Sequence, residues 1–195
     1  MSSLPAPRRI VTSNLPVPES LSKLDSSEPA VQVVTEEVPL VSELGGQWFK
    51  RSVFTHDRVP TSNAGTDITA KEIPGGGLRL PYGANIRFNE IPPGSRAAMH
   101  RTSTTDYNVF LTGSMVLITP AEAYDPDTME GAGKLQETVC QPGDVVVQRG
   151  TMHAWENRSG EWARFISVIL GAEETTMERG NGTSQTLADV FNFVL

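Results

Sequence analysis

The chain has 195 residues and a net charge of −7, with 38% hydrophobic residues, 17 glycines and 14 prolines. The acidic balance excludes a nucleic-acid partner, because phosphate recognition needs a concentrated basic surface that no segment supplies. Cys140 is the only cysteine, which excludes an intramolecular disulfide and a zinc ribbon. No apolar run is long enough for a bilayer span or a secretory signal, so we expect a cytoplasmic protein with a small-molecule partner and no membrane contact.

The first 30 residues are rich in proline and serine, as a disordered tail would be. Within them, the run from Arg9 to Thr12 is short and β-prone. An isolated strand in a tail must find the edge of a sheet, in its own barrel or in a second subunit. We therefore expect residues 1–30 to be an arm that is exchanged between the subunits of a homodimer.

From Val31 onward, short β-prone runs alternate with turns that contain glycine and proline. This rhythm predicts an all-β barrel over residues 31–183. Residues 184–192 show a helical spacing of Leu187, Val190 and Phe191, which predicts a short amphipathic helix that caps the barrel within 184–195. The acidic stretch 120–134 is longer than a hairpin loop, and a solvated insertion is favoured there over a substrate lid.

Two glycine-bounded segments contain two of the three histidines of the chain. In the first, Gly94 is followed by His100, Thr102 and Asp106, and Gly113 closes the segment. These positions resemble the first motif of the cupin superfamily, where two histidines, a glutamate and a glycine follow at the same intervals. Thr102 stands in the place of the second histidine, and Asp106 in the place of the glutamate.

The second segment resembles the second cupin motif. Gly150 precedes His153 and Asn157 follows it at the intervals of the family, whereas Arg149 stands where the family has proline. Over residues 75–170 the chain resembles a small stand-alone cupin of natural-product pathways. This resemblance implies a single cupin β-barrel of jelly-roll type, but it does not name a reaction, because cupins include oxygenases, lyases, isomerases and binding proteins.

Strand geometry predicts where the motif residues point. Residues two apart share a face of a strand, so His100, Thr102 and Asp106 are expected to face the barrel interior, with His153 approaching from across it. Two alternatives then remain open. His100, Asp106 and His153 could hold a divalent transition metal (Fe, Mn, Zn or Ni) as a triad of two histidines and one carboxylate. Alternatively, no cofactor is bound and both histidines act as acid–base groups.

Five further residues are candidates for binding a substrate. Thr102 can donate or accept one hydrogen bond. Trp155 shares a face with His153 and is expected either to wall the pocket or to fill the barrel. Arg87 and Arg164 could hold a carboxylate or enolate oxygen, with a solvent-facing position as the alternative. Gln148 precedes the histidine turn and could reach the mouth of the barrel.

The two histidines favour a lyase or isomerase that dehydrates, cyclises or moves protons. The resemblance to small cupins of natural-product pathways implies an oxygenated, polyketide-like metabolite of secondary metabolism as its substrate. His100 and His153 would transfer the proton, and Asp106 would orient a histidine or stabilise its cation. One alternative is a non-haem Fe(II) dioxygenase that uses His100, Asp106 and His153. The other is a cupin that binds a small ligand without turnover.

Overall fold

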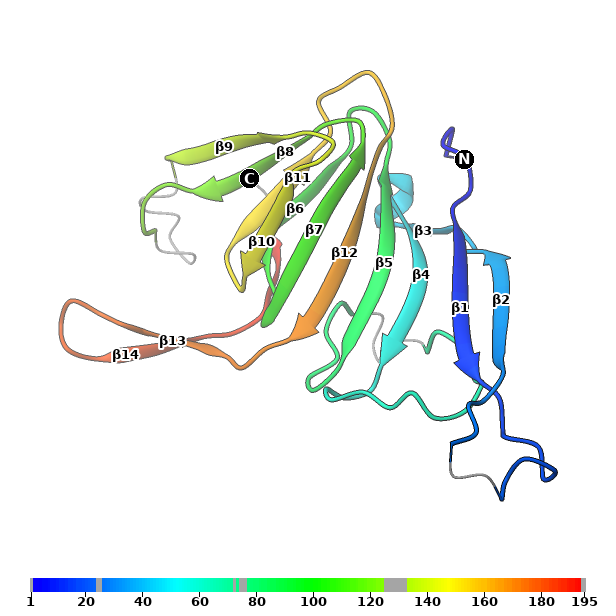
Figure 1. The fold of residues 1–195 in the computed structure, drawn as a ribbon. Coiled ribbons are helices and arrows are strands. Elements are labelled where there is room, and N and C mark those ends of the chain that lie inside the picture. Colours follow the sequence, from blue (N-terminus) through cyan, green and yellow to red (C-terminus); the bar gives the residue numbers. More distant parts are fainter. Residues whose placement is uncertain (1, 24–25, 72, 74–76, 125–132, 194–195) are drawn as a thin grey trace.

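The computed structural model describes residues 2–23, 26–71, 73, 77–124 and 133–193 (Figure 1). Within these residues the chain is almost entirely β-structure, with one short 3-10 helix, η1 (Leu44–Gly46). The all-β barrel expected from the sequence is thereby confirmed. The strands are β1 (Arg8–Asn14), β2 (Val31–Glu37), β3 (Val41–Glu43), β4 (Trp48–His56), β5 (Ala84–Ile91), β6 (Arg96–Arg101), β7 (Thr104–Thr112), β8 (Met115–Pro120), β9 (Leu135–Cys140), β10 (Val145–Arg149), β11 (His153–Glu156), β12 (Ala163–Gly171), β13 (Thr175–Glu178), β14 (Ser184–Leu187) and β15 (Val190–Phe193).

Two antiparallel sheets form the body of the barrel. One has the strand order β10-β7-β12-β5-β4-β3, and the other has the order β15-β6-β11-β8-β9. Figure 1 shows the two sheets facing each other, with β6 and β11 behind β7 and β10. Two smaller hairpins, β1–β2 and β13–β14, lie outside this body. No helix in the described part of the chain has the length and apolarity needed to cross a membrane.

The hydrophobic core lies between the two sheets, toward one end of the barrel. Phe110 of β7 has its ring centroid 5.5 Å from that of Trp155 on β11 and 5.0 Å from that of Phe165 on β12. Inward-facing aromatic residues therefore join the two sheets directly, as the alternating burial pattern of these strands requires. The core cluster consists of Trp48, Ile91, Ala97, Phe110, Met115, Cys140, Trp155, Ala163 and Phe165.

The N-terminal arm lies on the outer face of its own barrel. β1 pairs with β2 of the same chain, from Arg8 opposite Glu37 to Asn14 opposite Val31. Arg9 donates a hydrogen bond of 2.7 Å to the carbonyl of Val53 on β4, which ties the hairpin to the larger sheet. Exchange of the arm between subunits is thus not seen in this chain and stays a prediction.

The C-terminal helix expected over residues 184–192 is wrong. These residues form β14, which pairs with β13, and the beginning of β15, which pairs with β6. A helix of nine residues has little stability on its own, whereas an open sheet edge offers a ready set of hydrogen bonds. Residues 125–132 of the expected long loop lie outside the described residues, so its prediction as an insertion remains open.

Candidate active site

The pocket exists because three neighbouring strands change character at the same level. Phe110 and Phe165 fill the core, but the next inward positions along β7, β12 and β5 are Asn108, Ser167 and Arg87. The strand register places Ser167 directly opposite both Asn108 and Arg87. Because alternate residues share a face, this step from apolar to polar creates a polar floor inside the barrel.

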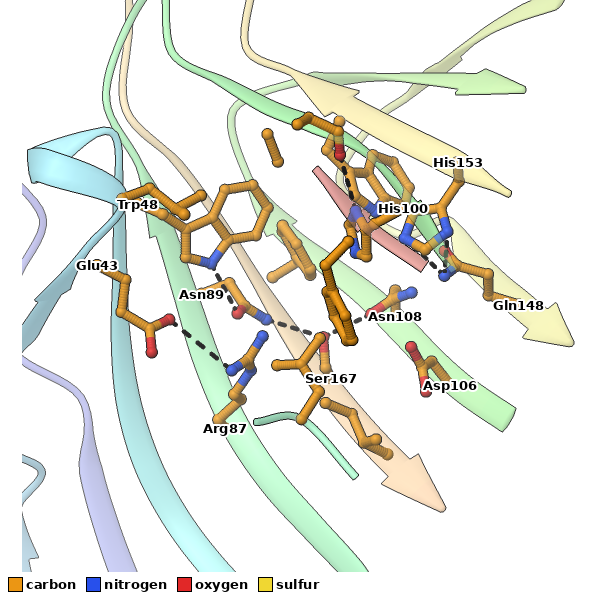
Figure 2. A pocket seen from close by; sticks show the side chains of 18 residues that line it. Glu43, Trp48, Arg87, Asn89, His100, Asp106, Asn108, Gln148, His153 and Ser167 are labelled. Atoms are coloured by element: carbon orange, nitrogen blue, oxygen red, sulfur yellow. Dashed lines mark hydrogen bonds and ion pairs between the residues drawn. The ribbon is translucent and has the colours of Figure 1, made fainter. Parts of the chain in front are cut away.

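Above this floor lies a cavity of about 290 Å³ (Figure 2). That volume is near the lower end of ligand sites, roughly 300 Å³, and nearly twice the roughly 150 Å³ that holds a benzene molecule. Leu44, Leu78 and Phe191 contribute apolar side chains from three separate segments, and Leu44 and Phe191 are exposed. The other lining residues are Glu43, Trp48, Arg87, Asn89, Ala97, Ala98, His100, Asp106, Asn108, Gln148, His153, Trp155, Phe165, Ser167 and Ile169.

A β-bulge in β6 directs His100 into the cavity. On β11, Trp155 lies opposite Ala97 and His153 lies opposite His100, so two steps on β11 match three on β6. The extra residue lets both Ala97 and His100 face inward. The two imidazoles are therefore direct neighbours in one sheet, with ring centroids 4.2 Å apart, and the expected approach of His153 from across the interior is wrong.

Hydrogen bonds to backbone carbonyls fix the tautomer of both histidines. Nδ1 of His100 lies 2.8 Å from the Ala98 carbonyl, and Nδ1 of His153 lies 2.9 Å from the Thr151 carbonyl. A carbonyl oxygen only accepts, so each Nδ1 carries the proton and each Nε2 presents a lone pair. The amide nitrogen of Gln148 lies 2.9 Å from Nδ1 and 2.8 Å from Nε2 of His153. Because Nδ1 already donates to Thr151, the amide donates to Nε2. Nε2 of His100 remains as a proton acceptor for a ligand.

Burial keeps both histidines neutral. Desolvation, with a smaller contribution from His100, lowers the pKa of His153 to about 3, and its side chain is 3% exposed. Desolvation also lowers the pKa of His100. Gln148 therefore holds a permanently neutral His153 in place, which leaves His100 as the imidazole that can exchange a proton with a ligand.

Asp106 belongs to the opposite sheet from the histidines. The chain leaves β6 after Arg101 and enters β7 at Thr104, so His100 and Asp106 do not lie on one continuous strand as the sequence reading assumed. Desolvation raises the pKa of Asp106 to about 6, against the hydrogen bond from Thr104 and the charge of Arg87. Its Oδ1 has no partner among the described residues. Asp106 therefore offers a second proton acceptor to the cavity.

The predicted metal triad is not assembled. No group of three His, Cys, Asp or Glu side chains within the described ranges is placed to hold a metal ion. The side-chain amide of Gln148 also occupies Nε2 of His153, the atom that a metal would need. The side chains His100, Asp106 and His153 therefore do not form a transition-metal site in this conformation.

Arg87 is a buried cation with few partners. It is 9% exposed, its nearest carboxylate is that of Glu43 at 3.9 Å, and its Nε has no partner among the described residues. Of the other predicted residues, Gln148 and Trp155 line the cavity, and Trp155 also belongs to the core cluster. A buried guanidinium with free donors favours an anionic or oxygen-rich ligand.

Thr102 and Arg164 do not line the cavity. Thr102 falls in the turn between β6 and β7, where its hydroxyl pairs with that of Thr104 at 2.8 Å. Arg164 precedes the inward-facing Phe165 and so points to the outer face, where it binds Glu90 at 2.8 Å. Their predicted roles in substrate binding are not supported by these positions.

A hydrogen-bonded network of buried polar side chains runs along the floor and was not predicted from the sequence. Trp48 binds Asn89, Asn89 binds Ser167 and Ser167 binds Asn108, with distances of 3.1, 2.8 and 2.5 Å (Figure 2). All four side chains are buried. Polar residues at successive inward positions of one strand, such as Arg87 and Asn89 on β5, could have indicated such a network. The sequence does not show which strands lie side by side.

Comparison with known proteins supplies relatives but no family model, since none matches the chain. Phomopsin biosynthesis cluster protein C' of Diaporthe leptostromiformis is 36% identical over 98 residues, which cover 50% of this chain and 45% of that protein. Oryzines biosynthesis cluster protein J of Aspergillus oryzae is 32% identical over 57% of this chain and 55% of its own length. A cupin-domain-containing oxidoreductase of Aspergillus ruber is 26% identical over 63% of this chain and 56% of its own length. The chain thus spans about half the length of the curated relatives it matches.

Among solved structures, the polyketide cyclase RemF from Streptomyces resistomycificus matches with a TM-score of 0.44 and 19% identity, over 81% of this chain and 82% of RemF. An oxalate oxidase matches with a TM-score of 0.36 and 19% identity, over 45% of this chain and 41% of that protein. Likeness at this level says nothing about chemistry.

Proposed function

The chain is a small cupin similar to proteins of fungal biosynthesis clusters, and we propose that it is an enzyme that transfers protons on an oxygenated small molecule of secondary metabolism. The observation that carries the proposal is the pairing inside one cavity of two proton acceptors with a buried cation. Asp106 and His100 are the acceptors, and Arg87 is the cation. This class of chemistry includes isomerisation, dehydration and ring closure.

The proposed reaction begins at a carbon next to a carbonyl group. The carboxylate of Asp106 takes the proton, the electrons of the C–H bond pass to the carbonyl oxygen, and Arg87 stabilises the charge that develops there. Nε2 of His100 accepts the proton of a hydroxyl on the same substrate, and the protonated imidazole then returns that proton to another substrate atom. His153 and Gln148 hold the ring of His100 from one side and take no proton themselves.

The raised pKa of Asp106 and the lowered pKa of His100 support this division of labour. A carboxyl with a pKa of about 6 is a stronger base than an ordinary carboxylate and is still ionised at pH 7. Burial lowers the pKa of His100, so its imidazole is neutral near pH 7 and can accept a proton.

Hydrogen exchange into 2-tetralone, a ketone whose two rings suit the cavity, tests the proposal. We expect the wild-type protein to accelerate deuterium incorporation next to the carbonyl in D₂O, followed by proton NMR. Asp106→Asn should slow the catalysed exchange about 10²- to 10⁴-fold, whereas His100→Gln should slow it less, because 2-tetralone has no hydroxyl group for His100 to deprotonate. Tyr107→Phe, altered at a residue that points outward, is the matched control and should exchange at the wild-type rate. Wild-type exchange at the background rate, or undiminished exchange in Asp106→Asn, would contradict the proposal.

The dioxygenase remains the second candidate because relatives such as the Aspergillus ruber protein are named oxidoreductases. It needs His100, Asp106 and His153 at one ion, which requires Gln148 to leave His153. Elemental analysis of protein purified without chelator is the check. One equivalent of iron per chain, lost in His153→Gln, would favour this candidate. Tight binding of 2-tetralone without exchange would instead favour a ligand-binding cupin.

A further inference from the structure

In the hydrogen-bonded network along the floor of the cavity, each side chain donates to the next, beginning at the indole of Trp48. Nε1 of an indole can only donate, so Asn89 must turn its oxygen toward Trp48 and its NH₂ group toward Ser167. The hydroxyl of Ser167 then accepts from Asn89 and donates to Asn108. Their separation of 2.5 Å is typical of an O–H···O bond and is short for an N–H···O bond, so Asn108 presents its oxygen to Ser167.

The consequence is that Asn108 turns its NH₂ group away from Ser167 and toward the ligand space. Asn108 lines the cavity and is 3% exposed, and the described residues offer no acceptor to its nitrogen. Arg87 lies at the same level of the sheet, on the other side of Ser167. Two buried groups that can only donate thus flank one point of the floor, and Figure 2 shows both beside Ser167.

The surroundings determine what such a pair can bind. Leu44, Leu78 and Phe191 line the cavity with apolar side chains, and Leu44 and Phe191 are exposed. Buried donors without acceptors are costly unless a ligand satisfies them. A ligand that satisfies them carries an acceptor oxygen at its inner end and an apolar, ring-sized body toward the mouth.

We propose that Asn108, oriented by Trp48, Asn89 and Ser167, forms with Arg87 a binding site for a carboxylate or enolate oxygen at the inner end of an aromatic or cyclic substrate. The proposal rests on the proposed function and deepens it by naming the substrate class. Asn108 is the binding residue. Ser167 and Asn89 are positioning residues, because they act through Asn108.

Benzoate and benzyl alcohol, which differ at the group that would enter the site, test the proposal by isothermal titration calorimetry. The wild-type protein should bind benzoate at least tenfold more tightly than benzyl alcohol, since hydrogen bonds to a charged group are the stronger ones. Asn108→Asp keeps the shape and the contact with Ser167 but replaces donors with acceptors. Benzoate affinity should then fall by roughly 10- to 100-fold. Benzyl alcohol, which can donate to the new carboxylate, should bind as well as before or better.

Ser167→Ala tests the orienting role. Without the hydroxyl proton the Asn108 amide can rotate, so the preference for benzoate should shrink several-fold while the affinity for benzyl alcohol stays within twofold. Thermal unfolding of each variant shows whether it folds. Equal loss of both ligands in folded Asn108→Asp, or an unaltered preference in both variants, would overturn the proposal.

The same measurements separate this proposal from the proposed function. Asp106→Asn removes a negative charge near the ligand and should bind benzoate at least as tightly as the wild-type protein, although it loses proton transfer. If Asp106→Asn retains full hydrogen exchange while Asn108→Asp inverts ligand preference, the proton-transfer role of Asp106 is wrong and the oxygen site stands. If hydrogen exchange depends on Asp106 but Asn108→Asp leaves the preference for benzoate unchanged, the proposed oxygen-binding site of Asn108 and Arg87 is wrong.

Discussion

Burial shifts the ionisation of the carboxyl group and of the imidazoles in opposite directions. Desolvation disfavours whichever form is charged, so the pKa of Asp106 rises to about 6, that of His100 falls and that of His153 falls to about 3. Near neutral pH the cavity therefore contains an ionised carboxylate and two neutral imidazoles. Both proposed proton acceptors are then in their active form without an external partner.

The pH dependence of the reaction follows from these states. Asp106 must be unprotonated to take the proton from carbon, so kcat/KM for hydrogen exchange should rise as pH increases through about 6 and level off above pH 7. The measurement is the exchange rate between pH 4.5 and pH 8. In Asp106→Asn the residual activity should lack the step near pH 6. A rate that falls across this range would show that Asp106 acts in its protonated form.

Asp106 should also lower the stability of the fold above pH 6. Its pKa of about 6 in the folded protein lies above the ordinary carboxyl value of 3.8, so between pH 4 and pH 6 the folded protein binds a proton that the unfolded chain has lost. The favourable contribution is present below about pH 4 and is lost as pH rises through about 6. Asp106→Asn should therefore raise the free energy of unfolding by about 1–3 kcal/mol at pH 8 and leave it nearly unchanged at pH 4. Urea denaturation at both pH values measures this, and destabilisation at pH 8 would contradict it.

At the scale of elements, the sequence predicted the strands that carry the site better than it predicted their neighbours. Glycine-bounded spacing located His100, His153 and Asp106 on inward-facing strands, and all three line one cavity. The spacing did not reveal that Asp106 lies in the opposite sheet, because the turn between β6 and β7 occupies only two residues, Thr102 and Ser103. The metal triad, one of the two alternatives left open by the sequence, came from the resemblance of this spacing to the cupin motif, which does not show how the side chains lie relative to one another.

The remaining differences also come from pairing between distant segments. Asn89, Asn108 and Ser167 meet only because β12 lies between β5 and β7, and contacts between residues 59 and 78 positions apart cannot be read from local pattern. The same pairing at the edge of β6 turned the expected C-terminal helix into β15. Local sequence gives the period of an element, whereas its partners depend on the whole fold.

The N-terminal arm depends on a buried ion cluster on the outer face of the larger sheet. Glu90 is fully buried and accepts hydrogen bonds of 2.8 Å from Arg51 and from Arg164. These two arginines also donate to the carbonyl groups of Val38 and Pro5, at 2.5 and 2.6 Å. One carboxylate therefore holds both ends of the segment that carries β1 and β2.

Replacement of Glu90 should release this segment. Glu90→Gln leaves two buried guanidinium groups without a counterion, which should cost about 3–5 kcal/mol in the free energy of unfolding. Residues 15–30 should also become more sensitive to limited proteolysis. Glu137→Gln is the matched control, because Glu137 binds Arg158 on the exposed surface and its loss should change neither measurement. Equal effects of the two substitutions would show that the buried cluster does not anchor the arm.

At the scale of the whole molecule, the arm covers only part of the outer face. β1 and β2 lie beside β4 and β5, while β7 and the edge strand β10 remain open on that side (Figure 1). Tyr107, Val145 and Val147 are 40%, 55% and 51% exposed there, and Val147 lies opposite Tyr107 in the register. Tyr107 follows the inward-facing Asp106 and so points away from the interior. An apolar face next to an open sheet edge favours association with another copy of the chain.

The homodimer predicted from the sequence can therefore be tested at this face. We expect light scattering after size exclusion to give a mass of about 42 kDa, twice the 21.1 kDa of one chain. Val147→Lys places a charge at the centre of the apolar face and should yield the monomer, whereas Met177→Lys, a change at an exposed apolar residue on the separate β13–β14 hairpin, should leave the dimer intact. Removal of residues 2–14 distinguishes the two modes of association. If the truncated protein stays dimeric, the contact lies on β7 and β10. If the truncated protein is monomeric while full-length Val147→Lys is still dimeric, the arm is exchanged between subunits.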